Sequence, residues 1–303
     1  MNKVYAGIDG GGTKTAISIL DSDGKLLYRN TGGPSSLTNG SEFENATVSV
    51  LREAFAALRE IYKTKIVFSV VAGYAGTNTE DYTLRFSNAF KKASLGYDIE
   101  PGSFKIISDA HLALDVYFQA GPGLLLVSGT GSICYGKNEN GDVFYSGGFG
   151  YLIDDAGSGF WFGKQAVKAA LLSGQGTGKK TILEEMTRSH FKISKTEELI
   201  SEIYCPDHRT LISSASRLVF DAAEKGCAIS QSIIEEGALA LSELALQCNR
   251  LIGNSSSCVV LHGSVFKQDI LVHHLKKRLG DTMNIYLSDK DIDLEAAGII
   301  YYS

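Results

Sequence analysis

The sequence lacks the features that mark membrane, secreted and nucleic-acid-binding proteins. Its 303 residues carry a formal net charge of −5 and contain no basic run long enough to bind a series of phosphates, so nucleic acid is not expected as a partner. No apolar run reaches the roughly 18 residues of a membrane span, and the first residues show no signal-peptide pattern. We therefore expect a soluble, cytoplasmic protein that acts on neither membrane nor nucleic acid.

Cysteine is also scarce, and the cysteines are not spaced as ligands of one metal ion or cluster. The five cysteines form no C-x-x-C pair, and their number is odd. Metal or cluster binding within one chain is therefore not expected, whereas buried thiols in a reducing compartment are. The cysteines are Cys134, Cys205, Cys227, Cys248 and Cys258.

Two common nucleotide-binding motifs are missing. The stretch 174–181 resembles a P-loop, but Ser173 takes the place of its first glycine and Lys180 the place of its serine or threonine. No G-x-G-x-x-G follows an expected strand. We therefore interpret 174–181 as a loop, and a dinucleotide site is not expected.

A glycine-rich turn between two apolar runs is the first positive signal. Residues 4–8 and 16–20 are expected strands, and Asp9-Gly10-Gly11-Gly12-Thr13-Lys14-Thr15 joins them. The glycines let successive N–H groups converge on an anion, and the threonines and the lysine add further donors. Asp9, at the strand end, could hold a hydrated Mg²⁺. The pattern indicates a phosphate- and metal-binding turn; a hairpin that merely uses glycine is the alternative.

The same layout recurs about 120 residues later. A strand over 124–128, the turn Gly129-Thr130-Gly131-Ser132 and a strand over 133–137 are followed by a third strand over 143–145, as 26–29 follows the first pair. A repeat at this distance is too long for a solenoid unit and suggests two duplicated domains. Two such hairpins facing each other would grip an oligophosphate from both sides.

The remaining segments alternate between helix and strand patterns, with a continuous apolar strand typical of a buried parallel sheet. In the first half we expect a helix over 41–62, a strand over 66–72, a helix over 82–93, a strand over 104–107 and a helix from Ser108. In the second half we expect a helix over 160–172, helices over most of 181–252, strands over 258–261 and 285–287, and a helix over 293–301. At roughly 100–200 residues per domain, this order predicts two α/β domains.

Polar residues at expected strand ends are candidates for chemistry. Asp109 follows a strand, where ligands of open α/β sheets bind, and could accept a hydroxyl proton during phosphoryl transfer. Aspartate is also a preferred helix N-cap, so capping alone is the alternative. Asp155, between glycine-rich runs, could bind a polyol or lie in a solvated turn. Gly263 and Ser264, after a buried strand, could approach a nucleotide base.

Six short motifs occur in order along the chain. They are D-G-G-G-T-K-T (9–15), S-D-A (108–110), S-G-T-G-S (128–132), G-G-F-G (147–150), D-D-A-G-S (154–158) and H-G-S-V-F (262–266). This ordered set resembles N-acetylglucosamine kinases and the wider BadF/BadG/BcrA/BcrD-type ATPase group of the actin/hexokinase/Hsp70 superfamily. The resemblance implies an α/β fold of two duplicated ribonuclease H-like (actin-like ATPase) domains with a cleft between them. Residues 1–115, completed by a helix over 291–303, would form one lobe and residues 116–290 the other.

The resemblance also implies a reaction and a role for each motif. ATP with Mg²⁺ would phosphorylate a hydroxyl of an amino sugar (N-acetylglucosamine, glucosamine or N-acetylmuramic acid), and the enzyme would be a homodimer. Asp109 would be the catalytic base, and Asp9 would support the metal. The residues implied to bind ATP are Gly11, Gly12, Thr13, Lys14, Gly129, Thr130, Gly131, Gly263 and Ser264. Those implied to bind the sugar are Ser36, Gly148 and Asp155.

Three departures from the family pattern concern the sugar pocket. Ser35-Ser36 stands where an asparagine often follows the Gly-Pro loop, Phe149 replaces a tryptophan, and Ala156 replaces an acidic residue. A serine leaves room for a larger substituent, such as the lactyl ether of N-acetylmuramic acid. The departures therefore leave the identity of the sugar open.

Two other functions compete with the kinase. An ATPase activator of a CoA-type dehydratase or reductase would bridge an iron–sulfur cluster through cysteines of two chains, but Cys134 lies within the second meander. A catalytically weak sugar-binding sensor is the other alternative, and the intact Asp9, Lys14 and Asp109 argue against it.

Overall fold

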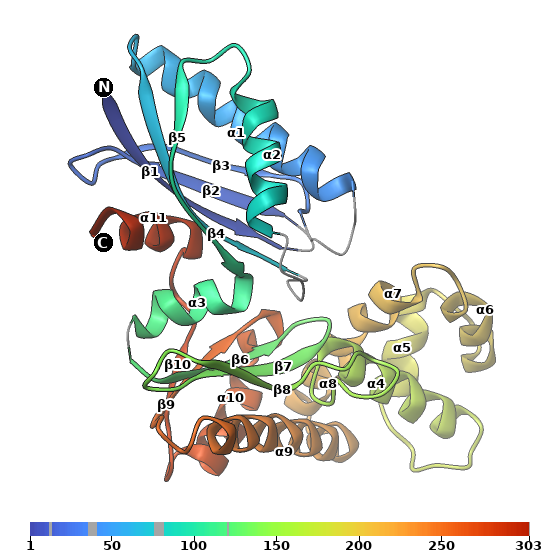
Figure 1. Ribbon diagram of the computed structural model, residues 1–303. Helices are drawn as coiled ribbons and strands as arrows, with labels where there is room; N and C mark the ends of the chain where they lie inside the picture. The colour runs from blue at the N-terminus through green and yellow to red at the C-terminus, as the bar shows by residue number, and fades with distance from the viewer. Residues whose placement is uncertain (12–13, 36–40, 76–81, 120, 303) are drawn as a thin grey trace. The chain divides into compact units, whose positions relative to one another are not determined.

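The chain divides into two compact units, each built on one five-stranded mixed sheet with packed helices (Figure 1). The first unit comprises Met1–Gln119 and Asp289–Ser303, and the second comprises Ala120–Ser288. The computed structural model describes residues 1–11, 14–35, 41–75, 82–119 and 121–302.

The first unit's sheet has the strand order β3-β2-β1-β4-β5. Its first three strands pair antiparallel, and the last two continue the sheet parallel to β1, as the sequence predicts. The strands are β1 (Asn2–Gly10), β2 (Thr15–Leu20), β3 (Leu26–Gly32), β4 (Ile66–Tyr74) and β5 (Ile99–Ser108).

Strand β5 is longer than the expected strand over 104–107. It begins at Ile99 and contains Pro101 and Gly102, which the sequence pattern suggests as a break. The register with β4 shifts between Phe68 and Val70, opposite this dipeptide. An edge strand tolerates proline at such an irregularity because one side of its backbone makes no ladder hydrogen bonds.

Helices cover both faces of the first sheet, and the residues of β1 show how each face is packed. Its buried apolar residues Val4, Ala6 and Ile8 belong to the core that α1 (Ser41–Ile61) and α2 (Tyr82–Ser94) complete. On the opposite face lie α3 (Asp109–Phe118) and α11 (Ile292–Tyr302) (Figure 1). A Cβ atom on Gly7 would overlap the carbonyl oxygen of Asp293, so only glycine lets α11 lie directly on β1.

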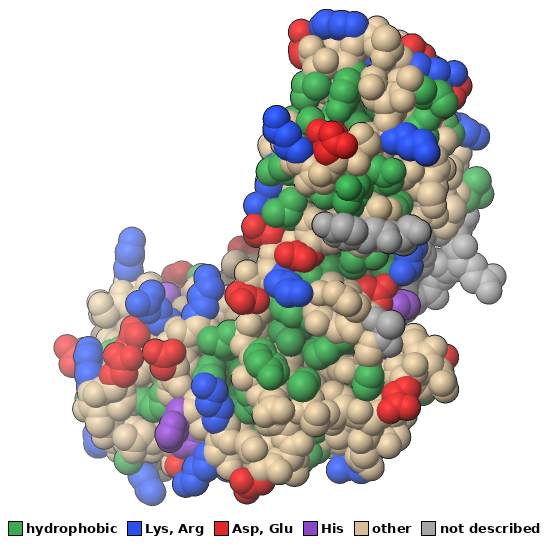
Figure 2. All heavy atoms as spheres, turned by 90° about the vertical axis from the view of Figure 1, so that its left-hand side faces the viewer, with side chains coloured by type: hydrophobic (Ala, Val, Ile, Leu, Met, Phe, Trp, Pro, Cys, Tyr) green, Lys and Arg blue, Asp and Glu red, His purple; other side chains and the backbone are tan. Residues whose placement is uncertain are grey.

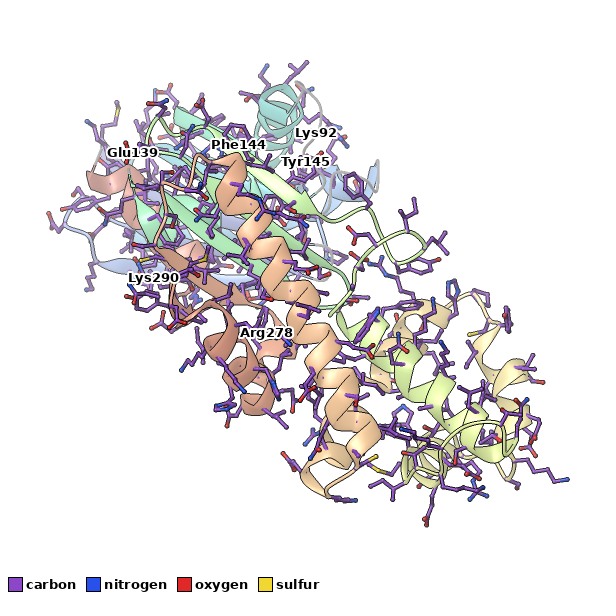
Figure 3. All side chains as sticks on the ribbon, turned by 90° about the horizontal axis from the view of Figure 1, so that it is seen from below. Lys92, Glu139, Phe144, Tyr145, Arg278 and Lys290 are labelled. Carbon is purple, nitrogen blue, oxygen red and sulfur yellow. The ribbon has the colours of Figure 1, made fainter. Side chains whose placement is uncertain are left out.

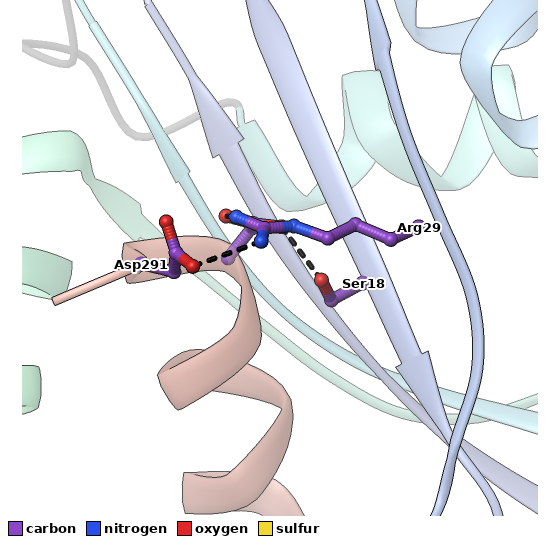
Figure 4. Close-up of polar contacts among 4 residues, drawn as sticks. Ser18, Arg29 and Asp291 are labelled. Atoms are coloured by element: carbon purple, nitrogen blue, oxygen red, sulfur yellow. Dashed lines mark hydrogen bonds and ion pairs between the residues drawn. The ribbon is translucent and has the colours of Figure 1, made fainter.

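A buried carboxylate anchors the start of α11 (Figure 4). Asp293 accepts hydrogen bonds from Arg29 Nε and Nη2, both at 3.0 Å, and from Ser18 Oγ at 2.6 Å. Arg29 Nη1 also donates to the exposed Asp291 at 2.8 Å. Since Arg29 and Ser18 belong to β3 and β2, this network ties the last helix to the first meander.

The second unit repeats the strand layout of the first. Its order, β10-β9-β6-β7-β8, again places an antiparallel meander beside two parallel strands. The predicted repeat, the meander over 124–145 and the strands over 258–261 and 285–287 are therefore confirmed. The strands are β6 (Gly123–Ser128), β7 (Ser132–Lys137), β8 (Val143–Gly147), β9 (Cys258–His262) and β10 (Asn284–Leu287).

The second unit's helices lie on and beside its sheet. Helix α9 runs along β7 and β8, and Phe144 of β8, labelled in Figure 3, packs against the buried core that this helix shares with the sheet. Residues 175–181 lie in the loop between α4 and α5, as expected, and Gly174 is the last residue of α4. The helices are α4 (Gly159–Gly174), α5 (Leu183–Phe191), α6 (Leu199–Ile203), α7 (His208–Ser214), α8 (Ser216–Glu224), α9 (Ala228–Leu251) and α10 (Asp269–Leu279). Short 3₁₀ helices are η2 (Thr196–Glu198) and η3 (Ser264–Lys267).

Candidate active site

The parallel strands of the first unit bring two predicted site residues to one edge of the sheet. Asp9 near the end of β1 is in register with Gly73 of β4, and Gly73 with Ile107 of β5. Asp109 follows β5 directly, and a Cβ atom on Gly73 would stand 3.0 Å from the Asp109 Cα atom. Asp109 therefore lies over the carboxyl end of β4, the neighbour of the strand that carries Asp9.

Asp109 does not cap its helix. The N-cap of α3 is Ser108, whose Oγ atom accepts the N–H of His111 at 3.0 Å. Asp109 is the first helical residue, and its Oδ1 atom accepts the adjacent N–H of Ala110 at 2.7 Å. The alternative that Asp109 is present only as a cap is therefore wrong, because its neighbour performs that task.

The Asp9 carboxyl lies in an electrostatically unfavourable place. Burial, then the charge of Asp109, then that of Asp293 raise the pKa of Asp9 from 3.8 to about 6, while Lys14 opposes them. Desolvation and like charge both disfavour the carboxylate form. Negative charge is thus concentrated at these strand ends, where a cation would relieve it.

Hydrogen bonds with the loop over residues 33–35 fix the first glycine-rich turn. The Ser35 N–H donates to the Gly11 carbonyl at 3.1 Å, and the Thr15 hydroxyl donates to the Gly33 carbonyl at 2.6 Å. Thr15 is fully buried and also shares a 2.6 Å hydrogen bond with the Ser35 hydroxyl. The expectation that Thr15 offers its hydroxyl to a phosphate is therefore wrong.

The open side of this turn carries Gly11 and Lys14. Gly11 donates its N–H to the Lys14 carbonyl at 2.9 Å, and the Lys14 side chain is exposed. Among the described residues, a Cβ atom on Gly11 would meet only the Lys14 carbonyl, at 3.5 Å. Packing does not explain glycine here, whereas close approach of a ligand would. The predicted residues Gly12, Thr13 and Ser36 lie outside the described residues.

The second turn, between β6 and β7, presents amide groups. The Gly129 N–H closes the turn on the Gly131 carbonyl at 3.0 Å, and the Ser132 N–H donates to Asp155 Oδ1 at 3.0 Å. Within the part of the chain that the structure describes, the N–H groups of Thr130 and Gly131 make no hydrogen bond. Two such amides at a glycine turn are suited to an anion.

Two further segments converge on this second turn. The Gly159 N–H donates to the Gly129 carbonyl at 2.7 Å, at the start of α4. Gly263, with φ at 118°, passes so close to Ser128 that a Cβ atom would overlap the Ser128 carbonyl oxygen. The Ser128 hydroxyl donates to the Gly157 carbonyl at 2.8 Å. The turn, the start of α4 and the residues after β9 are thus fixed together.

A pocket of about 170 Å³ opens where these segments meet. Of the predicted ATP-binding residues, Gly129, Thr130 and Ser264 line it. No motif in the sequence marks the wall of this pocket that α7, α8 and the residue after η3 provide, since these segments show only a helical pattern. The missed lining residues are Ser213, Ser216, Arg217, Phe220 and Gln268.

The predicted sugar-binding residues of the second unit have unusual backbones. Asp155, with φ at 67°, is only 3% exposed, so the alternative of a solvated turn is wrong for it. Burial raises the pKa of Asp155, whereas the hydrogen bond from Ser132 and the charge of Arg209 lower it. Gly148 is exposed with φ at 80°, and a Cβ atom there would overlap Ile133. Their role toward a sugar stays a prediction.

The cysteines offer no shared site in the described part of the chain. All five are free thiols, and Cys134 and Cys248 are buried. Within the described ranges, no cluster of three or more histidine, cysteine or acidic side chains is arranged to hold a metal ion. None of the helices in those ranges combines the length and apolarity needed to cross a membrane.

Two units with one strand order, each with a glycine-bearing turn between its first two strands, define an α/β protein of the actin-like ATPase class. A crystal structure from Chromobacterium violaceum, provisionally described as an N-acetylglucosamine kinase, has this fold, with a TM-score of 0.73, 20% identity and 99% of each chain covered. The chain belongs to the BadF/BadG/BcrA/BcrD ATPase family, whose sequence model matches residues 6–300.

Two relatives have assigned activities. An N-acetylmuramic acid/N-acetylglucosamine kinase of Clostridium acetobutylicum is 36% identical over 240 residues, 78% of this chain and 76% of that protein. An N-acetyl-D-glucosamine kinase of Dictyostelium discoideum is 29% identical over 291 residues, 91% of this chain and 90% of that protein. The family expected from the ordered motifs is thereby confirmed.

Proposed function

We propose that this protein is an ATP-dependent amino-sugar kinase that phosphorylates a hydroxyl of N-acetylglucosamine, glucosamine or N-acetylmuramic acid. The observation that carries the proposal is the pairing of Asp9 with Asp109 at neighbouring strand ends. Phosphoryl transfer needs one acceptor for the proton of the attacking hydroxyl and a means of neutralising phosphate charge. The activities assigned to the two relatives support the amino sugar as the acceptor.

Asp109 is the proposed general base. Since Ser108 caps the helix, Asp109 is not required for capping, and we take its carboxylate as the acceptor for the hydroxyl proton of the sugar. It would accept the hydroxyl proton as the sugar oxygen attacks the γ-phosphorus of ATP and ADP leaves. Asp109 would then carry the proton until it exchanges with solvent.

The second unit is the proposed binding site for the nucleotide. The free N–H groups of Thr130 and Gly131 would bind phosphate oxygens, and the pocket beside Ser264 would accept the adenosine. Its polar lining from Ser213 and Gln268 suits a base or ribose, which offers donors and acceptors. Gly11 and Lys14, on the open side of the first unit's own turn, are proposed as a separate phosphate-binding element.

The strand ends of the first unit fit Mg²⁺. Burial and the charge of Asp109 raise the pKa of Asp9 to about 6 despite the opposing charge of Lys14, so a further cation at this position would favour the carboxylate form. Mg²⁺ keeps several waters and usually needs only one or two carboxylates besides substrate phosphates. Asp9 would hold the hydrated ion, which supplies charge neutralisation at the phosphates.

Neither competing function has comparable support. An activator would bridge an iron–sulfur cluster through cysteines of two chains. Cys134 is fully buried, and the partly exposed Cys205, Cys227 and Cys258 belong to no cluster of metal-binding side chains among the described residues. On the face drawn in Figure 2, the described lysine and arginine side chains are interspersed with acidic ones and form no continuous basic patch. A homodimer and a cytoplasmic location stay predictions, and light scattering of the purified protein would test the first.

A panel of sugars in an ADP-release assay tests the proposal. We expect turnover with at least one amino sugar, dependence on Mg²⁺, and little ADP release without sugar. Equal ADP release with every sugar and with none would instead identify an ATPase, and no release at all would leave the sensor.

A further inference from the structure

An aromatic platform stands beside Asp155 in the second unit. Tyr151 follows the G-G-F-G motif, and its ring lies 4.8 Å from the ring of Phe160, measured between centroids. The Phe160 N–H donates to the carbonyl of Thr130 in the second turn at 3.4 Å. The platform therefore adjoins the turn proposed to bind phosphate.

Hydrogen bonds from α7 fix the orientation of this platform. His208 Nδ1 lies 3.1 Å from the Cys205 carbonyl, which can only accept, so Nδ1 carries the proton. In the neutral ring His208 Nε2 is then an acceptor, and the Tyr151 hydroxyl, 3.0 Å away, donates to it. Tyr151 is thus held by its hydroxyl on one side and by Phe160 on the other.

Arg209, the next residue of α7, rests on this platform. Its Cζ atom lies 5.4 Å from the centroid of the Tyr151 ring, within the range of a cation–π contact. Among the described residues, none forms an ion pair with Arg209, and its side chain is exposed. The positive charge of Arg209 lowers the pKa of Asp155. A guanidinium that is oriented but unpaired therefore faces solvent near a predicted sugar-binding carboxylate.

We propose that Arg209 binds a carboxylate carried by the sugar substrate and so determines the preference of this enzyme for acidic over neutral amino sugars. The inference rests on the proposed kinase function, and N-acetylmuramic acid, with its lactyl carboxylate, belongs to the acidic class. A planar guanidinium can hold a carboxylate through two parallel N–H···O bonds. The Tyr151 platform reduces the freedom that the arginine would otherwise lose on binding.

A polyphosphate is a weaker candidate for this position. The pocket beside the second turn has its own arginine, Arg217, from α8. Arg209, from α7, instead lies over the ring of Tyr151, and Tyr151 belongs to the loop that contains the proposed sugar-binding residues Gly148 and Asp155. An acidic sugar also supplies one carboxylate, which one guanidinium can satisfy.

The test compares the acid, its methyl ester and the neutral sugar. Initial rates with N-acetylmuramic acid, N-acetylmuramic acid methyl ester and N-acetylglucosamine are measured for the wild type, Arg209→Met, Arg209→Lys and Arg250→Met. Methionine keeps an apolar side chain against the Tyr151 ring, whereas lysine keeps the positive charge without the two parallel N–H donors of a guanidinium. Arg250, which is exposed in the last turn of α9, is the matched control. Calorimetric titration with N-acetylmuramic acid gives a binding constant independent of turnover.

We expect Arg209→Met to lower the kcat/KM ratio of the acid over the neutral sugar by about 10- to 100-fold, the value of a hydrogen bond to a charged group. The loss should appear mainly in KM and equally in the calorimetric constant. Arg209→Lys should lie between methionine and wild type, and Arg250→Met should keep the wild-type ratio. With the ester, Arg209→Met and wild type should differ far less than with the acid.

Several results would overturn the inference while the kinase function stands. These are a wild type that uses N-acetylglucosamine but not N-acetylmuramic acid, an Arg209→Met ratio equal to that of wild type, and an equal loss for acid and ester. A rise in the KM for ATP with every sugar would also overturn it, by assigning Arg209 to phosphate. A wild type without sugar-dependent turnover would instead refute the proposed function itself.

Discussion

The turn between β1 and β2 lies beside two carboxylates whose charges repel each other, whereas the one carboxylate beside the turn between β6 and β7, that of Asp155, accepts a hydrogen bond from the turn itself. Asp9 and Asp109 concentrate negative charge at the strand ends of the first unit and raise the pKa of Asp9 to about 6. Around the second turn, Ser128 and Gly159 bind backbone carbonyls, and the Asp155 carboxylate is turned inward to Ser132. One strand layout thus supports two different electrostatic environments.

This difference suggests that the two units have different roles in the proposed reaction. The amides of Thr130 and Gly131 can accept an anion directly, since they are free among the described residues. The acidic edge of the first unit would repel the same anion until a cation neutralises it. We therefore expect the first unit to determine chemistry and metal dependence, and the second to determine nucleotide affinity.

The largest expected effect is on catalysis through the first unit. Asp109→Asn keeps the shape of the side chain but removes the proton acceptor, so kcat should fall by about 10²- to 10⁴-fold. The KM for ATP should change little, because the proposed nucleotide pocket belongs to the second unit. ADP release at saturating sugar measures both values.

Ser108→Ala is the matched control for this substitution. It removes the N-cap hydrogen bond to His111 and should cost about 0.5–2 kcal/mol of stability without a comparable loss of kcat. If Asp109→Asn retained near-normal turnover, or if both variants lost activity in proportion to stability, Asp109 would have only a structural role.

The next effect compares glycines of the two regions. At Gly263, φ of 118° and the overlap of a Cβ atom with Ser128 make alanine costly, about 2–5 kcal/mol in the free energy of unfolding. At Gly11, where the described surroundings are open, alanine should change that free energy by less than about 1 kcal/mol. Urea unfolding of both variants checks the contrast, and equal losses would show that the first turn is as tightly packed as the second.

The sequence predicts these two turns well because their signals are local. Each meander consists of apolar runs separated by glycine-bearing turns, and such a pattern is recognisable within about thirty residues. The early start of β5 was not predictable in this way. Pro101 and Gly102 indicate a break, and only the irregular pairing with β4 at a sheet edge accommodates them.

In the candidate site, several features depend on contacts between residues that are distant in sequence, and local sequence patterns do not predict them. Ser108 and Asp109 are both favoured N-caps, and only the observed hydrogen bond to Ser108 distinguishes them. The burial of Asp155 depends on its contact with Ser132, which is 23 residues away in sequence. Residues such as Ser216 and Phe220 reach the pocket from a helix that carries no motif, so tertiary packing alone reveals them.

A smaller effect concerns the pH dependence of stability in the first unit. Folding raises the pKa of Asp9 from 3.8 to about 6, so the protonated form is favoured by the fold. Its stabilisation is complete below pH 3.8 and is lost as the pH rises to about 6. Without divalent cations, Asp9→Asn should therefore be more stable than wild type at pH 7, by up to about 3 kcal/mol.

Denaturant unfolding of both proteins from pH 4 to pH 7 measures this difference. The gap between Asp9→Asn and wild type should open across that interval, while Mg²⁺-dependent turnover is lost in the variant. Asp155→Asn is unsuitable as a control because Asp155 accepts a structural hydrogen bond. Asp281→Asn is preferable, because Asp281 is exposed after α10 and its side chain makes no hydrogen bond among the described residues. A gap that is independent of pH would show that Asp9 does not titrate in this range.

The smallest effect distinguishes the acceptors of two fully buried serines. Ser18 of β2 donates to the Asp293 carboxylate at 2.6 Å, and Ser128 of β6 donates to the Gly157 carbonyl at 2.8 Å. Because a hydrogen bond to a charged group contributes about 1.5–3 kcal/mol and a neutral one about 0.5–1.5 kcal/mol, Ser18→Ala should be the more destabilising change. The double variant should show additive losses, since the two serines belong to separate networks in different units. A larger loss for Ser128→Ala in urea unfolding would mean that the packing of the second turn outweighs the charge of the first unit.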